Sequence, residues 1–481
     1  MNQLYFGDNL FILKNLYSQH PNGFIDLIYI DPPFNSKRNY NVLFESIDLS
    51  DSTAQKEAFA DTWSNISYID TLNELANLNL HLYSFLTNLE NIGISKSAIS
   101  YLTTMSIRIW YMHKLLKETG SFYLHCDPTM SHYLKIVCDI IFNEKNFKNE
   151  VIWHYRRWTG DAKSFMKMHD VILFYAKNKN DIKFNVLYTD YTEKSLKRKQ
   201  NYHTRIKGDD VYVTSIDEKG VKENDVWQIQ LLNSQSHERQ GYPTQKPESL
   251  LERIILASSN SDDLIADFFC GCGTSIAVAE KLKRKWIGVD ISHLAVRLIA
   301  NRIGKENINK TFEIHGLPKD LDSAKELANN VKGGRLEFEE WVVEFLLHGI
   351  LNEKRNEMGF DGYRTFDANG KRCFAMIEVK SGNVTMAQFN HFLKTVNDKK
   401  GDLGIFVSFE DQITKNMRIA AKREGNFAIN DNVFSDKIQI STIEDLLDNR
   451  VPKIPESTKE TFKKAIKKIN EDATQPTLDM F

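Results

Sequence analysis

Three short apolar runs in this chain each lead directly into an aspartate. They are Ile25–Ile30 before Asp31, Leu264–Ala266 before Asp267, and Lys285–Val289 before Asp290. Runs that are apolar almost without interruption and alternate with helical patterns are typical of buried strands in a parallel, doubly wound α/β sheet. Because ligands bind beyond the carboxyl ends of such strands, the three aspartates mark the expected site.

Length and composition exclude several classes of protein. At roughly 150 residues per domain, 481 residues suggest about three folding units. With 42% hydrophobic and 26% charged residues, wholesale disorder is excluded. No apolar run reaches the roughly 18 residues of a membrane helix, and Asp8 interrupts any secretory signal. Five cysteines are too few for a disulfide framework, which predicts a reducing, cytoplasmic setting. A net charge of −2 excludes a protein that is basic over its whole surface, but it allows local basic patches that bind nucleic acid.

The run that ends at Asp267 continues into a glycine turn, Gly271-Cys272-Gly273-Thr274, and then into a helical pattern. Glycine has no Cβ, so backbone N–H groups can approach a ligand closely. Asp290 lies 290 − 267 = 23 positions further on, at the end of the next strand, where an acid suits a ribose diol. The pattern lacks the third glycine of a dinucleotide fingerprint, which favours a nucleoside ligand such as S-adenosylmethionine. Taken alone, the turn is equally compatible with a plain βαβ connection.

The run that ends at Asp31 continues into Pro32, Pro33 and Phe34. Two prolines remove two N–H donors and leave carbonyl groups free to accept hydrogen bonds. A carboxylate, a carbonyl and an aromatic ring together suit a flat base with an exocyclic amine: Phe34 stacks on the base, while Asp31 and the Pro32 carbonyl accept the amine hydrogens. The alternative is a strand that prolines terminate and an aspartate caps.

Four segments follow one another along the chain: Gly7–Leu10, Asp26–Phe34, Gly241–Pro247 and Asp267–Thr274. In this order they resemble the amino-methyltransferases of DNA in their permuted β arrangement, in which the catalytic motif precedes the cofactor motif. The resemblance covers about residues 1–310. It implies a Rossmann-like methyltransferase sheet over residues 1–318, with an inserted DNA-recognition region at about 151–240.

The same resemblance implies roles for individual residues. The catalytic tetrapeptide is Asp31, Pro32, Pro33 and Phe34. The residues implied in S-adenosylmethionine binding are Asp8, Lys246, Asp267, Phe268, Phe269, Gly271, Gly273, Thr274 and Asp290. Among them, Asp290 holds the ribose, Asp8 lies near the adenine, and Lys246 flanks the cofactor carboxylate. The chain departs from the family at Phe268, usually a proline, and at Cys272, often a serine.

In this family a methyl group passes from S-adenosylmethionine to N6 of adenine or N4 of cytosine. The DPPF ending goes more often with adenine, so we expect an adenine-specific, site-specific DNA methyltransferase of a restriction-modification system, with cytosine-N4 as the alternative. Either base must leave the duplex to reach the pocket. The strand before His125 is expected to be a core strand, and His125 itself is given no catalytic role.

Basic and aromatic side chains alternate between the two motif groups. The candidates for contact with double-stranded DNA are Arg156, Arg157, Lys197, Arg198 and Lys199. Such a mixture suits phosphate contacts and base stacking. The alternative for any one of them is a solvated surface residue. The sequence leaves the oligomeric state open, a homodimer included.

A second α/β pattern occupies residues 334–447, after a connector at 319–333 and before a charged tail at 448–481. Asp361 and Glu378 lie 17 positions apart, as across a hairpin, and could hold Mg²⁺, with Lys380 on the face of Glu378. Glu344 on a preceding helix is a further candidate ligand. The set resembles the PD-(D/E)xK restriction-endonuclease core, nearest its Mrr-like branch. An active nuclease, which would make the chain a bifunctional restriction-modification enzyme, and an inactive DNA-binding relic both stay open.

Overall fold

The computed structural model describes residues 2–33, 67–157, 165–191, 204–207, 210–213, 219–233, 236–240, 242, 244–306, 312–330, 334–352, 358–368, 370–430 and 433–455. Phe34, Lys197, Arg198, Lys199 and most of the charged tail lie outside these ranges. None of the helices in the described ranges combines the length and the apolar character that a membrane crossing requires.

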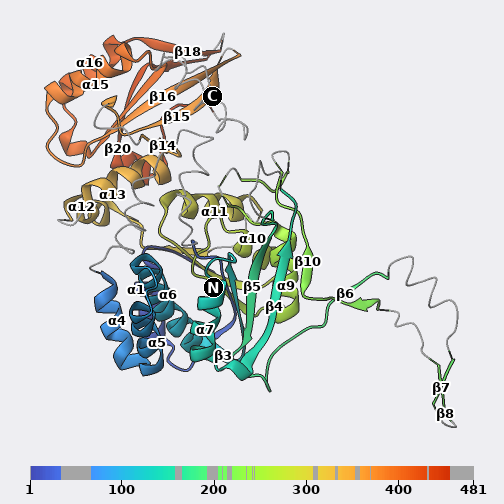
Figure 1. The fold of residues 1–481 in the computed structure, drawn as a ribbon. Helices are drawn as coiled ribbons and strands as arrows, with labels where there is room; N and C mark the ends of the chain where they lie inside the picture. The colour runs from blue at the N-terminus through green and yellow to red at the C-terminus, as the bar shows by residue number, and fades with distance from the viewer. Residues whose placement is uncertain are drawn as a thin grey trace.

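A nine-stranded sheet forms the centre of the larger part of the molecule (Figure 1). From edge to edge its strands are β10 (Val226–Gln228), β4 (Phe147–His154), β5 (His169–Ala176), β3 (Leu116–Cys126), β2 (Ile25–Ile30), β11 (Leu264–Asp267), β12 (Lys285–Asp290), β1 (Asn2–Phe6) and β13 (Phe312–His315). All neighbours are parallel except β5, which runs antiparallel to both β3 and β4. The sheet is therefore mixed, with a parallel centre.

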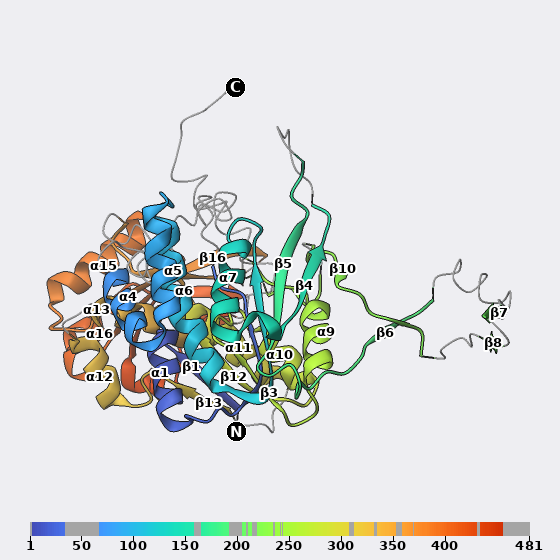
Figure 2. The same cartoon turned by 60° about the horizontal axis from the view of Figure 1, so that its bottom comes forward.

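Helices cover both faces of this sheet (Figure 2). One face carries α1 (Asn9–Gln19), α4 (Ser67–Leu78), α5 (Leu80–Asn91), α6 (Lys96–Leu115) and α7 (Ser131–Phe142); the other carries α9 (Glu248–Ser258), α10 (Thr274–Lys281) and α11 (His293–Glu306). Along β2 the side chains alternate between the two cores: Leu27 and Tyr29 join the α9–α11 side, and Ile28 and Ile30 join the α1–α7 side. This explains why β2 is apolar at nearly every position. Helices on both faces agree with the predicted doubly wound sheet, but the antiparallel β5 makes the sheet mixed where a parallel one was expected.

The two motif strands lie next to each other. Ile265 and Ala266 of β11 pair in parallel with Leu27 and Ile28 of β2. From β2 the chain continues to β3 on one side, whereas from β11 it continues to β12 on the other. Their junction is thus a topological switch point, where the loops that follow the two strands part and leave room for a ligand.

The segment expected to be a separate recognition region divides into two parts. β4, β5 and β10 belong to the central sheet, because Val151, Trp153 and Ile172 are buried in its core. Between β5 and β10 the chain forms two small antiparallel pairs, β6 (Tyr188–Thr189) with β9 (Val221–Lys222) and β7 (Thr204–Lys207) with β8 (Asp210–Val213). These two strand pairs project away from the central sheet (Figure 1), whereas β4, β5 and β10 belong to it. We call the segment between β5 and β10 the excursion.

The C-terminal part has its own five-stranded sheet, ordered β14 (Ile350–Leu351), β15 (Gly362–Ala368), β16 (Lys371–Val379), β17 (Leu403–Ser408) and β20 (Ile438–Thr442). Its other elements are α12 (Leu321–Asn329), α13 (Gly334–Glu340), the π-helix η2 (Trp341–Leu346), α15 (Met386–Asp398), α16 (Lys415–Arg423), β18 (Asn426–Asn430), β19 (Val433–Asp436) and α17 (Ile443–Leu447). The predicted connector therefore contains a helix, α12, which begins with a capping box at Asp320. The predicted helix that carries Glu344 runs from Gly334 to Leu346, with its second half as the π-helix η2.

The two parts contact each other through α11. The guanidinium of Arg297, which is 4% exposed, donates to the carbonyl oxygen of Glu344 and, at 3.3 Å, to that of Gly349. Buried side chains of both parts also belong to one continuous apolar cluster. The helix that follows Asp290 therefore anchors the C-terminal part.

Candidate functional site

The first half of the site lies at the carboxyl end of β2. Asp31 follows Ile30, and Pro32 and Pro33 end the strand because neither can donate to a sheet ladder. The Asp31 carboxylate is paired with the Lys246 ammonium group, and its other oxygen lies 3.4 Å from His125 Nδ1. Lys246, predicted to flank the cofactor carboxylate, thus contacts the aspartate that is predicted to be catalytic.

His125, to which the sequence assigns no catalytic role, lies beside Asp31 in the structure. It follows Leu124, the β3 partner of Ile30, and is completely buried. Its Nε2 lies 3.3 Å from an oxygen of Asp170 on β5, and its Nδ1 lies 3.2 Å from the Tyr29 hydroxyl. The other oxygen of Asp170 accepts from the Tyr155 hydroxyl at 3.2 Å. The expectation of a core strand is confirmed, but His125 also joins Asp31 to Asp170.

Charges around this cluster shift the pKa of two of its members. Burial acts to raise the pKa of Asp170, but the hydrogen bond and charge of His125 and the charge of Lys246 outweigh it, and the pKa is lowered. Burial and the negative charge of Asp31 hold the pKa of Tyr29 well above its usual value. At neutral pH Asp170 is therefore ionised, and the Tyr29 hydroxyl keeps its proton.

The second half of the site is the glycine turn after β11. Gly271 and Gly273 have φ of +51° and +73°, in the left-handed region that favours glycine. A Cβ on Gly273 would also lie 2.4 Å from the Ile299 side chain, so only glycine fits there. Thr274 then begins α10, whose first backbone N–H groups lie just after the turn.

Two aspartates hold this turn in place. Asp267 accepts hydrogen bonds from the Ser275 hydroxyl and the Phe269 N–H, while Asp290 accepts from the N–H groups of Gly271 at 2.8 Å and Ser292 at 2.9 Å. Burial raises the pKa of Asp267 to about 7 and that of Asp290 to about 6. Asp290 remains partly exposed and each carboxylate oxygen has two lone pairs, so it can still accept from a ligand hydroxyl.

The N-terminal turn joins the same site. Asp8 caps α1 by accepting from the Leu10 N–H at 2.6 Å, and it also lies 3.4 Å from the buried Arg108 guanidinium. The Asn9 amide donates to the Phe268 carbonyl at 2.8 Å, which ties this turn to the glycine turn. The Phe268 side chain is fully buried in the core, so the cofactor contact expected of this residue would have to come from its backbone.

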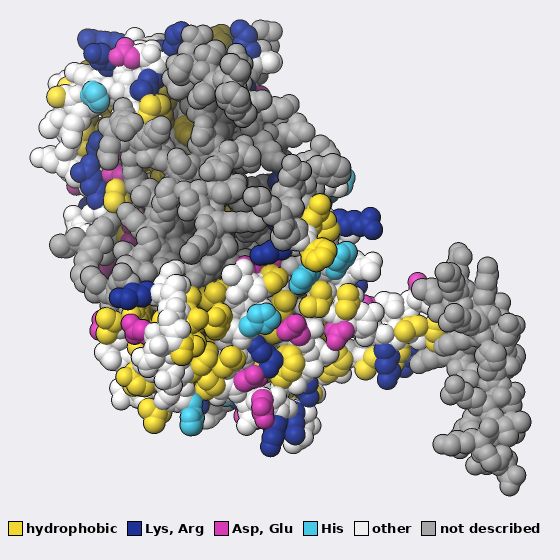
Figure 3. Space-filling model, viewed as in Figure 1, with side chains coloured by type: hydrophobic (Ala, Val, Ile, Leu, Met, Phe, Trp, Pro, Cys, Tyr) yellow, Lys and Arg dark blue, Asp and Glu magenta, His cyan; other side chains and the backbone are white. Residues whose placement is uncertain are grey.

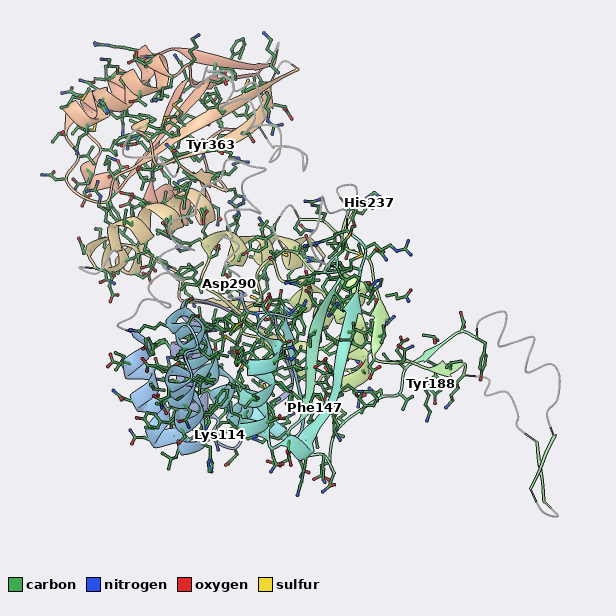
Figure 4. The ribbon with its side chains drawn as sticks, in the orientation of Figure 1. Lys114, Phe147, Tyr188, His237, Asp290 and Tyr363 are labelled. Atoms are coloured by element: carbon green, nitrogen blue, oxygen red, sulfur yellow. The ribbon has the colours of Figure 1, made fainter. Side chains whose placement is uncertain are left out.

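The arrangement puts the site at one end of the strands. Asp290 lies near α11, whereas Lys114 and Phe147 lie at the opposite end of the sheet (Figure 4). Glycine backbone, a partly exposed carboxylate and the Asp31 cluster therefore meet at the β2–β11 switch point. Such a set fits a nucleoside cofactor beside a polar acceptor.

Of the predicted DNA contacts, Arg156 and Arg157 lie exposed just after β4. On the face in Figure 3, lysine and arginine side chains are scattered among acidic and apolar ones rather than gathered in one patch. The other three predicted contacts fall outside the described residues.

In the C-terminal part, the β15–β16 hairpin brings the predicted carboxylates together. Lys380 is paired with Glu378 and lies 3.8 Å from Asp361, which accepts from the Val379 N–H at 2.7 Å. Burial, Asp361 and Glu339 together raise the pKa of Glu378 to about 7, against the effect of Lys380.

Glu344 does not join this group. It interacts with Arg297 of α11, and burial raises its pKa to about 7. The helix carboxylate whose charge acts on Glu378 is Glu339 instead. Across the described ranges, no group of three or more His, Cys, Asp or Glu side chains is arranged to hold a metal ion.

The family model described as "DNA methylase" matches residues 25–301, more than half of the chain. The chain belongs to the DNA methylase family. The match begins at β2 and ends in α11, so it contains the whole β2–β11 junction.

Two relatives and one solved structure illustrate how this family member compares with others. It is 28% identical to the Type II methyltransferase M.HpaI of Haemophilus parainfluenzae over 197 residues, which cover 40% of this chain and 56% of that one. It is 26% identical to the DNA adenine methyltransferase YhdJ of Escherichia coli (strain K12) over 309 residues, or 62% and 81% of the two chains. The cytosine-N4-specific PvuII DNA methyltransferase matches in structure with a TM-score of 0.37 and 16% identity, over 63% and 86% of the two chains. The chain thus spans little more than half the length of M.HpaI.

Proposed function

We propose that the protein is a site-specific DNA methyltransferase that transfers a methyl group from S-adenosylmethionine to N6 of adenine in double-stranded DNA. The observation that carries this proposal is the β2–β11 junction, where Asp31 and the glycine turn belong to neighbouring strands. Membership of the DNA methylase family supports it, as does the similarity to a relative named as a DNA adenine methyltransferase.

Gly271, Gly273 and Asp290 would hold the cofactor, with the backbone of the turn against it and Asp290 on the ribose hydroxyls. When bound, S-adenosylmethionine supplies an electrophilic methyl group. Asp31 and the Pro32 carbonyl would accept the two amine hydrogens of a base that has left the helix, so that the nitrogen lone pair is turned toward that methyl group. The ion pair with Lys246 holds the Asp31 carboxylate in place.

The setting of the reaction follows from two further observations. All five cysteines are free and buried, which supports the reducing, cytoplasmic environment predicted from the sequence. A methylase-family part and a carboxylate–lysine cluster in one chain support a role in restriction-modification. Arg156, Arg157 and the excursion between β5 and β10 are the proposed DNA contacts.

The test is methyl transfer to DNA amplified in vitro, which carries every short sequence and no modification. After incubation with labelled S-adenosylmethionine, mass spectrometry of the digested nucleosides should show N6-methyladenine. N4-methylcytosine would establish the alternative acceptor. Unmodified nucleosides at all enzyme concentrations would contradict the proposal.

A second candidate function is metal-dependent cleavage of DNA by the C-terminal part. Asp361 and Glu378 would hold Mg²⁺, and Lys380 lies within reach of both carboxylates. The metal would polarise a phosphodiester and activate water. Incubation of unmodified plasmid with the protein and Mg²⁺ tests this function: Mg²⁺-dependent cleavage supports it, and intact plasmid across many substrates would make the cluster a relic.

A further inference from the structure

A chain of polar side chains leads away from Asp31 into the protein. Asp31, His125 and Asp170, here called the relay, come from β2, β3 and β5, three neighbours in the sheet. The two ring nitrogens of His125 lie 3.4 Å and 3.3 Å from one oxygen each of Asp31 and Asp170. His125 is fully buried, whereas the Asp170 side chain is 16% exposed. The relay thus runs from the proposed acceptor site to a group that solvent can reach.

Hydrogen bonding determines which nitrogen of His125 carries the proton. The Tyr29 hydroxyl keeps its proton, so it can donate to Nδ1 at 3.2 Å. Asp170 is ionised and can only accept, so Nε2 carries the hydrogen that faces it. The Nδ1 lone pair then lies beside Asp31. The Trp153 ring, 5.4 Å away and edge-on, helps to hold the imidazole in this orientation.

Methylation of an amine releases a proton. A carbon–nitrogen bond forms with the nitrogen lone pair, the carbon–sulfur bond breaks with its electrons going to sulfur, and one N–H bond must break with its electrons going to nitrogen. The amine therefore begins with two hydrogens and ends with one. Asp31 is the proposed acceptor of one of these hydrogens, so the released proton arrives next to His125.

We propose that His125 and Asp170 are positioning residues that take this proton from Asp31 and pass it toward solvent. The inference rests on the proposed methyltransferase function and adds the route of its proton. The proton moves from the amine nitrogen to Asp31, and from Asp31 to Nδ1 of His125 as the Tyr29 hydroxyl turns its hydrogen away from that nitrogen. The imidazolium then gives its Nε2 proton through Asp170 to water. Once the product has left, Nε2 regains a proton from water through Asp170 and Nδ1 releases its proton through Asp31 into the emptied acceptor site, which restores the starting tautomer.

The charges of the cluster favour uptake of the released proton. The titratable and charged groups that face His125 in the described part of the chain are Tyr29 and Asp31 from the β2 side and Asp170 from β5, with Tyr155 and Lys246 behind the two carboxylates. With neutral His125, Asp31 and Asp170 outweigh Lys246 by one negative charge. One added proton, on Asp31 or on His125, brings the sum to zero, and a buried cluster is more stable when its charges balance.

The test compares the full-length wild type with His125→Asn and Asp170→Asn in single-turnover methyl transfer to amplified unmodified DNA between pH 5 and 8, the range in which histidine side chains change charge. Both variants should bind S-adenosylhomocysteine and DNA as the wild type does, yet transfer about 100-fold more slowly. The pH profile of the rate should differ between His125→Asn and the wild type. Asp170→Glu, which keeps the carboxylate, should recover part of the rate.

His113→Asn is the matched control, because His113 lies in the last turn of α6, next to Lys114, which marks the end of the sheet opposite Asp290 (Figure 4). It should transfer at the wild-type rate. A His125→Asn rate within threefold of the wild type with the same pH profile would overturn the relay, as would an equal loss in His113→Asn. If the wild type transfers no methyl group, the proposed function itself fails; an active wild type with unaffected relay variants refutes the relay alone.

Discussion

The two carboxylate–lysine clusters of this molecule are built in opposite ways. In the C-terminal part, Glu378 lies in β16 and Lys380 lies two positions further on, just past the end of that strand, while Asp361 lies just before the hairpin partner β15. In the methylase part, Asp31 is paired with Lys246, which lies 215 positions away in the sequence. A short sequence motif is therefore enough to find the Glu378–Lys380 pair. The Asp31–Lys246 pair is seen only in the folded structure, because its residues lie far apart in the sequence.

The comparison also separates the proposed chemistries. The Asp31 cluster lies beside a glycine turn that fits a nucleoside, and the Asp361 cluster has two carboxylates suited to a hard cation. A substitution in one cluster should therefore lower the activity proposed for that cluster and leave the activity proposed for the other unchanged.

The largest expected effect comes from Asp31→Ala. Removal of the carboxylate that accepts the amine hydrogen should lower methyl transfer by about 10³-fold, within the usual range for such groups. Calorimetry should show unchanged binding of S-adenosylhomocysteine, since the glycine turn that would hold it follows β11 whereas Asp31 follows β2. Glu378→Ala is the control and should methylate normally; modified bases in DNA treated with Asp31→Ala would contradict the assignment.

Lys380→Ala tests the other cluster. Plasmid cleavage with Mg²⁺ should fall about 100-fold or more, because the ammonium group that neutralises both carboxylates is lost. Methyl transfer by the same preparation should be unaffected. Cleavage that survives in both Lys380→Ala and Glu378→Ala would remove this cluster from the reaction.

Gly273→Ala should have a moderate effect on the glycine turn. Its φ of +73° and the 2.4 Å approach to Ile299 force the turn to shift, at a cost of about 1–3 kcal/mol. Binding of S-adenosylhomocysteine should weaken about tenfold or more, as measured by calorimetry. Gly271→Ala has room for its Cβ, with the nearest atom at 3.4 Å, and should lose less; the reverse order would contradict this account of the turn.

The smallest effect concerns pH. The folded pKa of Asp267 is raised to about 7, above its usual value of 3.8, so the folded state binds this proton more tightly than the unfolded state. The contribution of protonated Asp267 to the free energy of unfolding is therefore largest below about pH 4. This contribution, roughly 1–4 kcal/mol, is lost as the pH rises toward 7. Urea unfolding at several pH values should show a flatter dependence for Asp267→Asn. An unchanged slope would contradict the shift.

Much of this fold follows from sequence patterns. The apolar strands before Asp31, Asp267 and Asp290 were predictable because buried parallel strands carry little else. The neighbouring position of β2 and β11 follows from the resemblance. The contact between His125 and Asp170 could not be predicted from the sequence. It depends on β5 lying antiparallel between β3 and β4.

The misassigned Glu344 has a local cause. The prediction assumed one regular helix, but α13 changes to a π-helix at Trp341. This change alters which side chains share a face, so Glu344 lies toward Arg297 while Glu339 stays near Glu378.

The most direct test of the central claim is an experimental structure of the protein with S-adenosylhomocysteine bound. The account predicts ribose hydroxyls on Asp290, the glycine turn against the ligand, and the sulfur directed toward Asp31. A ligand bound elsewhere, or one whose sulfur points away from Asp31, would contradict it.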